Sequence, residues 1–519
     1  MSWKSVLEQI KEREKLALEM GGAERVARHV AAGRLPVRER INRILDDGSF
    51  HEVGALTGRV EYDDKGNIKD YTPSNFVTGK GLIDGRPIVI GADDFSVRGG
   101  AADGSIGNKR GWGEKTAREL RIPIVRLVDG TGGGGSVKTD KAIMRSYVPA
   151  NPDWDVHVDL MSKVPVVAAA LGPTAGLGAA RVSASHFSVM VKKTSQLFVA
   201  GPPVVYRAFG KRVDKEELGG FDVHKSSGAV DNFVETEEEC FEHIKRFLSY
   251  LPSSVWEVSS RLPNDDDPSR KDESLLSIVP TDRRKLYNMR TILGFVFDHD
   301  SIFEIGKTFG RSLITSLARL DGIAVAVMAN DPKFWAGSID ADAAEKMTRF
   351  VDMADTFHLP VINFVDNPGF LVGSQAEAQG TIRKGVRALS AVFQADIPWC
   401  SVIVRKAFRV AGAGHSNHTR SSPRYAWPSG EWGSLPVEGG VEAAYKRRIE
   451  AAEDPDKLRQ ELEEELAELK NPILTAEVFG VEEIIDPRNT RPLLVEFARQ
   501  AHKNLLNGPL GPKSRGIRP

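Results

Sequence analysis

Two stretches of the sequence, DGRPIVIGADDFSVRGG at residues 84–100 and DGIAVAVMANDPKFWAGS at residues 321–338, follow the same plan. Each opens with an Asp-Gly turn, continues as a short apolar run, and ends in a loop that contains glycine. An Asp-Gly pair before a β-branched run is typical of a turn followed by a β-strand. The pattern predicts that one strand–loop unit occurs twice in this chain.

The repeat extends beyond these two stretches. The same spacing of 237 residues separates four matching pairs: Asp84 and Asp321, Gly100 and Gly337, Pro123 and Pro360, and Asp129 and Asp366. In each copy a helix-like stretch follows the loop, and a buried strand comes next. A third pair of segments, which begins at Val164 and at Ile397, has an offset of 233 residues. This order predicts two α/β domains of similar topology, each with parallel strands and crossover helices.

The boundary between the two domains is expected in the stretch LPNDDDPSRKDES at 262–274. This stretch is polar and acidic, contains proline and has no apolar period, which is typical of a linker. The predicted domains are therefore residues 1–262 and 275–519. Residues 442–470 are strongly helical and charged, which indicates a solvated helix face, and Pro455 is expected to begin a new helix capped by Asp454.

Composition excludes several classes of protein. The 519 residues include 70 basic and 71 acidic ones, so a net charge of −1 provides no field for nucleic acid or for an anionic membrane. Two cysteines cannot build a disulfide framework or a four-cysteine zinc site. The longest apolar run, 164–171, is much shorter than a membrane span of roughly 18–20 residues. We expect a protein of the cytoplasm or of the mitochondrial matrix, with no membrane partner and no bound metal.

Glycine-rich turns follow the predicted strands in both halves, at 129–135, 172–178, 366–369 and 411–414. Neither the P-loop nor the dinucleotide fingerprint fits them, because Ser136 follows the first turn and Arg181 stands where a third glycine belongs. His415 and His418 lack the spacing of a metal pair on a helix. Tight strand–helix packing is one explanation of such turns. The other is an oxyanion hole, in which peptide N–H groups meet developing negative charge, and two holes suggest a reaction with two oxyanions.

At these residues the sequence resembles the carboxyltransferase (β) subunits of biotin-dependent acyl-CoA carboxylases, of the propionyl-CoA and methylcrotonyl-CoA carboxylase kind. The resemblance covers roughly residues 5–505. Its segments include VTGKGLIDGRPIVIGADDFSVRGG at 77–100, LGPTAGLGAA at 171–180, LPVINFVDNPGFLVGSQAEAQGTIRKG at 359–385 and SPRYAWPSGEW at 422–432. It implies two crotonase-like (ClpP/crotonase) domains, each a superhelix of ββα units.

The resemblance also implies the chemistry. A carboxyl group would pass from carboxybiotin, carried by a partner, to the α or vinylogous γ carbon of an acyl-CoA through a thioester enolate. The partners would be a biotin carboxylase and a biotin carboxyl carrier, because this chain has no biotinyl Met-Lys-Met motif. The family forms each active site from the N-domain of one chain and the C-domain of another. A homo-oligomer follows, a dimer that usually extends to a hexamer.

Site residues are carried over from the family position by position. The enolate hole is expected at Gly176, Leu177 and Gly178, and the biotin hole at Val410, Ala411 and Gly412. The residues expected to bind the cofactor are Gly133, Gly134, Gly369, Phe370 and Ala413. Those expected to contact the substrate are Ala102, Thr174, Ala175, Arg409 and His415.

Departures from the family leave alternatives open. The usual RKAYGGAYD turn is RKAFRVAGAGHSN here, so Arg409 and Val410 replace two glycines and the second hole could shift toward Gly412-Ala413. Arg409 and His415 could meet a polar or carboxylated acyl group, or could be surface charges. Three other functions also remain: the carboxyltransferase subunit of a biotin-dependent decarboxylase, a biotin-independent crotonase-like enzyme with Glu114 or Asp129 as its base, and a scaffold without turnover.

Overall fold

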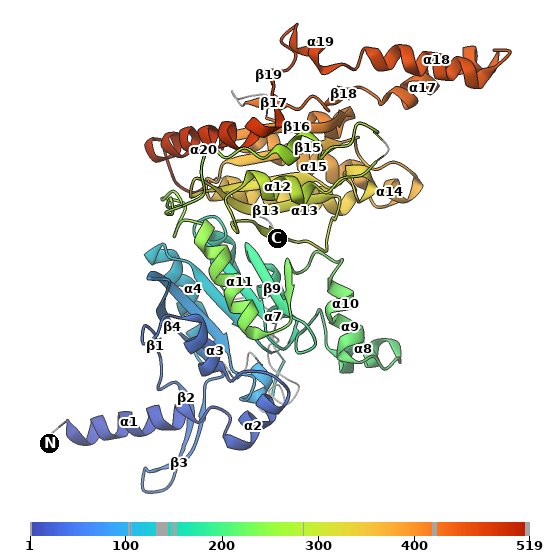
Figure 1. The fold of residues 1–519 in the computed structure, drawn as a ribbon. Coiled ribbons are helices and arrows are strands. Elements are labelled where there is room, and N and C mark those ends of the chain that lie inside the picture. Colours follow the sequence, from blue (N-terminus) through green and yellow to red (C-terminus); the bar gives the residue numbers. More distant parts are fainter. Residues whose placement is uncertain are drawn as a thin grey trace. The chain divides into compact units, whose positions relative to one another are not determined.

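A computed structural model describes residues 3–101, 104, 106–130, 144–146, 148, 153–283, 285–417 and 423–513. The chain divides into two compact units, Met1–Glu257 with Gly511–Pro519, and Val258–Leu510. The stretch 262–274, in which the sequence indicated the boundary, therefore lies inside the second unit. In Figure 1 the first unit is coloured from blue to green and the second from yellow-green to red.

The first unit is built on a seven-stranded sheet with the order β1-β4-β5-β6-β7-β9-β11. Its strands are β1 (His51–Val53), β4 (Phe76–Ile83), β5 (Arg86–Asp93), β6 (Ile124–Val128), β7 (Val166–Ala170), β9 (Phe187–Val191) and β11 (Asn232–Val234). From β5 onward all neighbours are parallel, whereas β1, β4 and β5 pair antiparallel. Two small sheets add β2 (Gly58–Tyr62) with β3 (Ile68–Pro73), and β8 (Pro173–Ala175) with β10 (Gln196–Phe198).

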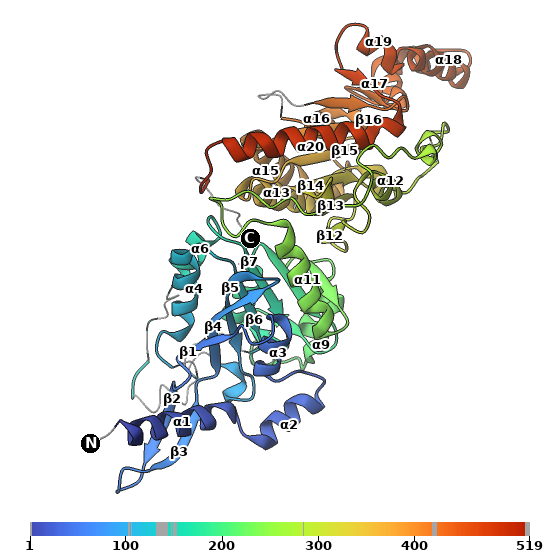
Figure 2. The same cartoon turned by 60° about the vertical axis from the view of Figure 1, so that its left-hand side comes forward.

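The helices of the first unit lie on both sides of this sheet. They are α1 (Lys4–Leu18), α2 (Ala23–Ala31), α3 (Val37–Ile44), α4 (Lys109–Leu120), α6 (Trp154–Leu160), α7 (Leu177–Ser183), α8 (Pro202–Phe209), α9 (Lys215–Gly219), α10 (Phe221–His224) and α11 (Glu237–Tyr250). Figure 2 shows α4 and α6 on one side, and α3 and α11 on the other. The parallel strands follow one another in one direction across the sheet, so right-handed crossovers keep α4, α6 and α7 on one face, and the chain winds as a superhelix.

The second unit repeats this plan. Its sheet has the order β12-β13-β14-β15-β16-β17-β19, with β18 paired to β16, and it is parallel from β14 onward. The strands are β12 (Phe303–Ile305), β13 (Leu313–Leu320), β14 (Ile323–Asn330), β15 (Val361–Asn367), β16 (Trp399–Phe408), β17 (Arg424–Ala426), β18 (Glu431–Gly433) and β19 (Glu483–Ile484). The pairs β4/β13 and β5/β14 keep the offset of 237 residues at both ends, so the predicted internal repeat is confirmed.

The helices of the second unit are α12 (Met289–Val296), α13 (Ala341–Thr356), α14 (Ser374–Ala378), α15 (Thr381–Gln394), α16 (Arg409–Ala413), α17 (Val437–Glu450), α18 (Pro455–Glu468), α19 (Pro472–Ala476) and α20 (Thr490–Asn507). α18 begins at Pro455, and the Asp454 carboxylate accepts a hydrogen bond from the Lys457 N–H, as the sequence predicted. Helices α17 and α18 lie side by side (Figure 1). They share a small apolar core, so one face of the charged segment is buried.

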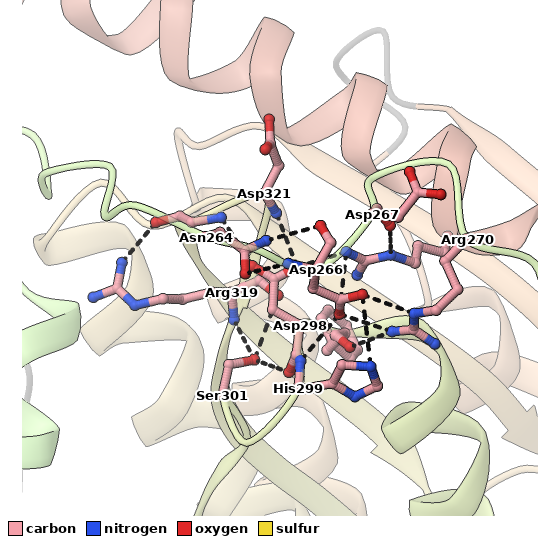
Figure 3. Close-up of polar contacts among 12 residues, drawn as sticks. Asn264, Asp266, Asp267, Arg270, Asp298, His299, Ser301, Arg319 and Asp321 are labelled. Atoms are coloured by element: carbon pink, nitrogen blue, oxygen red, sulfur yellow. Dashed lines mark hydrogen bonds and ion pairs between the residues drawn. The ribbon is translucent and has the colours of Figure 1, made fainter.

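The Asp-Gly turn of each unit is held by one carboxylate from a distant segment. Asp46 accepts hydrogen bonds from the N–H groups of Asp84 and Gly85 at 2.9 and 2.8 Å. In the second unit Asp298 does the same for the turn at 321–322, at 3.0 and 2.8 Å. Figure 3 shows Asp298 and Asp321 within a larger network that also holds Asp266 and Arg270. Asp266 also pairs with Arg491 at 3.3 Å, and Glu273 pairs with Arg488 at 2.9 Å, so ion pairs tie the residues of the predicted linker to the rest of the second unit.

Candidate functional site

The glycine-rich turn at 172–178, called the first turn from here on, connects β7 to α7. After β7 the chain forms the short strand β8 and enters α7 at Leu177. Gly176, just before the helix, has φ 59° and ψ −124°, a conformation that glycine adopts without the cost of a Cβ. Among the described residues, the N–H groups of Leu177, Gly178 and Ala179 have no acceptor. Three free donors at the start of a helix can bind an oxyanion.

The corresponding turn of the second unit connects β16 to α16. β16 ends at Phe408, and Arg409 then takes a positive φ of 60°. The N–H groups of Val410 and Ala411, the second and third residues of α16, have no acceptor within the part of the chain that the structure describes. Val410 is 63% exposed, so a ligand can reach this turn. The second turn therefore also presents free backbone donors.

The two turns correspond residue by residue. With the offset of 233 residues, Gly176 matches Arg409 and Leu177 matches Val410. The φ values of the first pair are 59° and 60°, so Arg409 has the positive φ of the glycine at the equivalent position of the repeat. By the same offset Val410 lies at the position of Leu177, the first free donor of the first turn.

Each unit has a further turn, at residues 98–100 and 335–337, that lies close to the backbone of Asp129 or Asp366. Residues 98–100 all have positive φ, and so do residues 335–337. A Cβ on Gly100 would overlap the carbonyl oxygen of Asp129, and one on Gly337 would overlap that of Asp366. Only glycine allows this close approach. Sequence analysis did not assign these glycines a role; their shared offset was the signal that could have found it.

Buried ion pairs hold the strand ends in place. Asp129 is fully buried and accepts a hydrogen bond from Nη1 of Arg40 at 2.7 Å, while Nε of Arg40 donates to Glu237 at 2.7 Å. In the second unit Asp366 pairs with Arg405 at 3.0 Å and accepts a hydrogen bond from the Tyr287 hydroxyl at 2.8 Å. Burial raises the pKa of Tyr287, so its hydroxyl remains a donor. The two aspartates act as structural anchors.

Glu114 is an unsuitable general base. It accepts two hydrogen bonds from Arg126, at 2.9 and 2.8 Å, inside the core. Burial alone would raise the pKa of Glu114, but the charges of Arg126, His157 and Arg181 outweigh it and lower the pKa to about 2. Such a carboxylate has little tendency to take a proton near pH 7. Neither of the two bases that the biotin-independent alternative requires is therefore available to a substrate.

Arg409 and His415 line a cavity of about 180 Å³ in the second unit. The Arg409 side chain lies over Gly369, where an added Cβ would be 2.8 Å from Cδ of the arginine. Nε of Arg409 is buried and has no hydrogen-bond acceptor among the described residues. Nδ1 of His415 lies 2.6 Å from the carbonyl oxygen of Gly412, so this histidine holds the turn itself.

The remaining predicted residues are distributed between the units. Thr174 is buried and donates to the Gly172 carbonyl at 3.1 Å, and Ala175 pairs with Phe198 in the small sheet. Phe370 forms a bridge to Ile339 and packs against Gly385, whereas Ala413 is exposed in α16. Gly133, Gly134 and Ala102 lie outside the described residues. The described members of the set are Thr174 and Ala175 in the first unit, and Gly369, Phe370 and Ala413 in the second.

Known carboxyltransferases are similar to this chain along nearly its whole length. The carboxyl transferase domain family matches residues 28–511. The propionyl-CoA carboxylase carboxyltransferase subunit of Haloferax mediterranei is 34% identical over 504 residues, which are 96% of each chain. The methylmalonyl-CoA decarboxylase alpha subunit of Veillonella parvula is 32% identical over 477 residues, which cover 92% of this chain and 91% of the relative.

A solved structure shows the same likeness in three dimensions. The transcarboxylase 12S subunit, whose crystal structure shows a hexamer assembly with methylmalonyl-CoA and methylmalonic acid bound, superposes with a TM-score of 0.87 at 30% identity. The alignment covers 100% of this chain and 99% of that subunit. In the described part of this chain, none of the helices combines the length and the apolar character that a membrane span needs.

Proposed function

The chain belongs to the carboxyl transferase family, has its crotonase-like fold, and is a carboxyltransferase of the biotin-dependent acyl-CoA carboxylase class; from this premise we propose that its two turns are the oxyanion holes of the reaction. The first would hold the thioester enolate of an acyl-CoA. The second would hold the ureido oxygen of biotin. The observation that carries the proposal is the pair of free N–H sets at equivalent positions of the repeat.

The second turn fits a biotin ureido oxygen. Its donors are uncharged peptide N–H groups, and the exposed Val410 leaves room for a ring to approach. When bound, carboxybiotin supplies the carboxyl group and the base that takes the α-proton. The chain itself then has to stabilise negative charge and exclude competing bases, which agrees with the sequestered carboxylates of Glu114 and Asp129. Removing one such donor typically costs about 3 kcal/mol of transition-state stabilisation.

The experiment deletes one donor at a time. Leu177→Pro removes the N–H at the first position of α7, where proline is tolerated, and Leu177→Ala keeps that N–H as a matched control. Val410→Pro and Val410→Ala form the corresponding pair at the second turn, at the second residue of α16. With the biotin-carrying partner present, each proline variant should lose roughly 10²–10³ in kcat relative to its alanine control.

Folding of the variants must be checked separately. Thermal unfolding and the size of the assembly should agree between the proline and alanine variants of each pair. If the proline variants fold normally and turn over acyl-CoA as fast as their controls, the backbone N–H groups are not the oxyanion holes.

The acyl group that this site accepts is proposed to be polar or carboxylated. Arg409 carries a buried Nε without an acceptor, directly beside the second turn. A buried guanidinium N–H that has no partner costs free energy, and a carboxylate or carbonyl on the substrate would supply the missing acceptor. His415 lies against the Gly412 carbonyl of the same turn, so we expect it to hold the turn in place rather than to contact the substrate.

A decarboxylase is the second candidate, because the Veillonella parvula relative named as a methylmalonyl-CoA decarboxylase subunit is 32% identical. The partners distinguish the two. Co-purification of the tagged chain from its native cells, probed with labelled streptavidin, should recover a biotinylated partner. A partner with an ATP-dependent biotin carboxylase supports the carboxylase, and an integral membrane partner supports the decarboxylase.

The assembly is proposed to be a dimer of chains that extends to a hexamer. The related 12S subunit forms a hexamer. In this chain α15 exposes an apolar stripe at Ile382, Val386 and Phe393, and α8 exposes Val204 and Phe209. Such surfaces are typical of subunit interfaces. Light scattering of the purified chain would test the proposal, and a stable monomer would contradict it.

A further inference from the structure

Arg40 joins the first turn to a cluster of buried ion pairs. It lies on α3, and its side chain is 1% exposed. Nη2 of Arg40 donates a hydrogen bond to the carbonyl oxygen of Leu171 at 3.1 Å, and Leu171 is the residue just before the turn. Nη1 donates to Asp129 and Nε to Glu237, each at 2.7 Å. A single guanidinium therefore holds two carboxylates and the backbone from which the turn begins.

The Asp129 carboxylate also packs against the residue that opens the turn. A Cβ on Gly172 would lie 2.0 Å from Oδ1 of Asp129, so this oxygen occupies the space that a side chain would need. Oδ2 of the same carboxylate accepts the hydrogen bond from Arg40. A buried carboxylate that loses its cation is strongly destabilised, so Asp129 and Arg40 are expected to move together. A displacement of Arg40 would therefore also displace Gly172.

The far end of the turn is held by backbone hydrogen bonds. The Gly176 N–H donates to the carbonyl oxygen of Phe198 at 3.0 Å, and the Ala180 N–H donates to that of Gly176 at 3.0 Å. Helix α7 begins directly after Gly176, at Leu177. The turn is short, so the place of the free Leu177 N–H depends on both ends of it. One of these ends is the backbone that Arg40 holds.

In the second unit the matching aspartate is bonded directly to the strand that leads to the turn. Asp366, which matches Asp129 at the offset of 237 residues, accepts a hydrogen bond from the Lys406 N–H at 3.2 Å. Helix α12 matches α3 at an offset of 252 residues, and this offset places Ile292, a residue of the apolar core, at the position of Arg40. A change at Arg40 should therefore affect the first turn and not the second.

We propose that Arg40 is a positioning residue of the reaction, which sets the place of the first turn and thereby aligns the N–H groups that meet the enolate oxygen. The inference rests on the proposed function, because that function makes the first turn an oxyanion hole. Arg40 is buried and acts through Leu171 and Asp129 rather than on the substrate. A misplacement of about 1 Å can lower a rate on the order of 10²-fold, so a side chain that touches no reacting atom can still control kcat.

The test replaces Arg40 by lysine, which keeps the positive charge beside the carboxylates but lacks the planar fork that also reaches Leu171. Arg38→Lys is the matched control, because Arg38 lies on the same helix and pairs with Glu52 at 2.7 Å. Bicarbonate fixation is measured with the biotin-carrying partner on the fastest-reacting member of a panel of acetyl-, propionyl- and 3-methylcrotonyl-CoA. Arg40→Lys should lower kcat about 10–100-fold at an unchanged KM for the acyl-CoA, whereas Arg38→Lys should leave both values unchanged.

A double-mutant cycle separates positioning from a general loss of structure. Arg40→Lys is combined with Leu177→Pro, which removes a donor of the first turn, and with Val410→Pro, which removes one of the second. Residues that act through the same contact give non-additive effects. The loss in kcat from Arg40→Lys should therefore largely disappear beside Leu177→Pro and persist in full beside Val410→Pro. A merely structural role would lower kcat by the same factor in both backgrounds.

Thermal unfolding of each variant checks that it folds. If Arg40→Lys does not fold, Glu237→Gln takes its place, because an amide NH₂ would then face the guanidinium N–H groups and shift Arg40 at a conserved side-chain size. The same dependence on the background is expected.

The outcomes separate this inference from the proposed function. If Leu177→Pro loses turnover but Arg40→Lys keeps its kcat, or loses it equally in both backgrounds, the inference is overturned and the function stands. If Leu177→Pro itself keeps full turnover, the first turn is not the enolate hole, and the inference falls with that assignment.

Discussion

Replacing Gly100 by alanine tests whether the close approach of two backbone segments positions the first site. In the structure Gly100 has a φ of 67°, and an added Cβ would overlap the carbonyl oxygen of Asp129. The left-handed conformation alone costs roughly 1–2 kcal/mol for a residue with a Cβ. The overlap with backbone adds about 1–3 kcal/mol, as is typical when a packed region must shift. We expect Gly100→Ala to destabilise the first unit by about 2–5 kcal/mol.

The neighbouring Gly99 provides a matched control. It has a φ of 62°, but the nearest atom to an added Cβ is Cε2 of Phe95, at 4.0 Å. Its counterpart in the second unit is Ala336, which occupies a φ of 53°. Gly99→Ala should therefore pay only the conformational cost, about 1–2 kcal/mol. The difference between the two variants isolates the contact with the Asp129 carbonyl.

Thermal unfolding at one protein concentration is the assay, because oligomers change their apparent stability with concentration. At about 2–4 °C per kcal/mol for a unit of this size, Gly100→Ala should lower the melting temperature of the first unit by roughly 4–20 °C. Gly337→Ala should do the same in the second unit, since its Cβ would overlap the Asp366 carbonyl. If Gly100→Ala and Gly99→Ala melt at the same temperature, the close approach does not constrain the turn.

Three further predictions concern charged side chains. Glu114→Gln should remove about 3 kcal/mol of stability near pH 7, because Arg126 and its neighbours outweigh burial and lower the Glu114 pKa from 4.5 to about 2. This contribution to stability is fully present above pH 4.5 and is lost as the pH falls toward 2. Denaturation curves of the variant and the unchanged protein should therefore converge in acid. Asp298→Ala should lower the free energy of unfolding by about 3–5 kcal/mol, and Asp46→Ala by about 1–3 kcal/mol. Both carboxylates hold an Asp-Gly turn, but Asp298 is also buried in an ion pair with Arg491. Equal losses in urea unfolding would contradict this difference. Arg409→Ala should change the ranking of acyl-CoA substrates by kcat/KM, and an unchanged ranking would show that its guanidinium does not contact the acyl group.

Some structural features were predictable from the sequence because their signals are local. Strands buried on both faces appear as short apolar runs, and glycine marks the turns that end them. The repeat offset of 237 residues pairs Gly100 with Gly337 and Asp129 with Asp366 from the sequence alone. Family resemblance added the chemistry, and the comparisons confirm both the fold and the class of enzyme.

Other features depend on residues that are far apart in the chain. Arg40 meets Asp129 across 89 positions and Glu237 across 197, and no periodicity connects them. The sequence indicated Asp129 as part of a glycine turn and as one possible base, whereas the structure shows it as a buried anchor. The cavity lined by Arg25, Arg34 and Phe95 has the same origin, because α2 and the turn after β5 meet only in the folded unit.

By itself the sequence determined that the chain contains one α/β unit twice, with a glycine turn after matching strands, because strand and turn preferences depend on neighbouring residues. The tertiary structure alone decided which N–H groups remain free, that Arg409 adopts the positive φ of Gly176, and that Glu114 is neutralised in the core. These properties arise from packing between distant segments. A backbone donor is free, or a carboxylate is sequestered, only through what the folded chain places beside it.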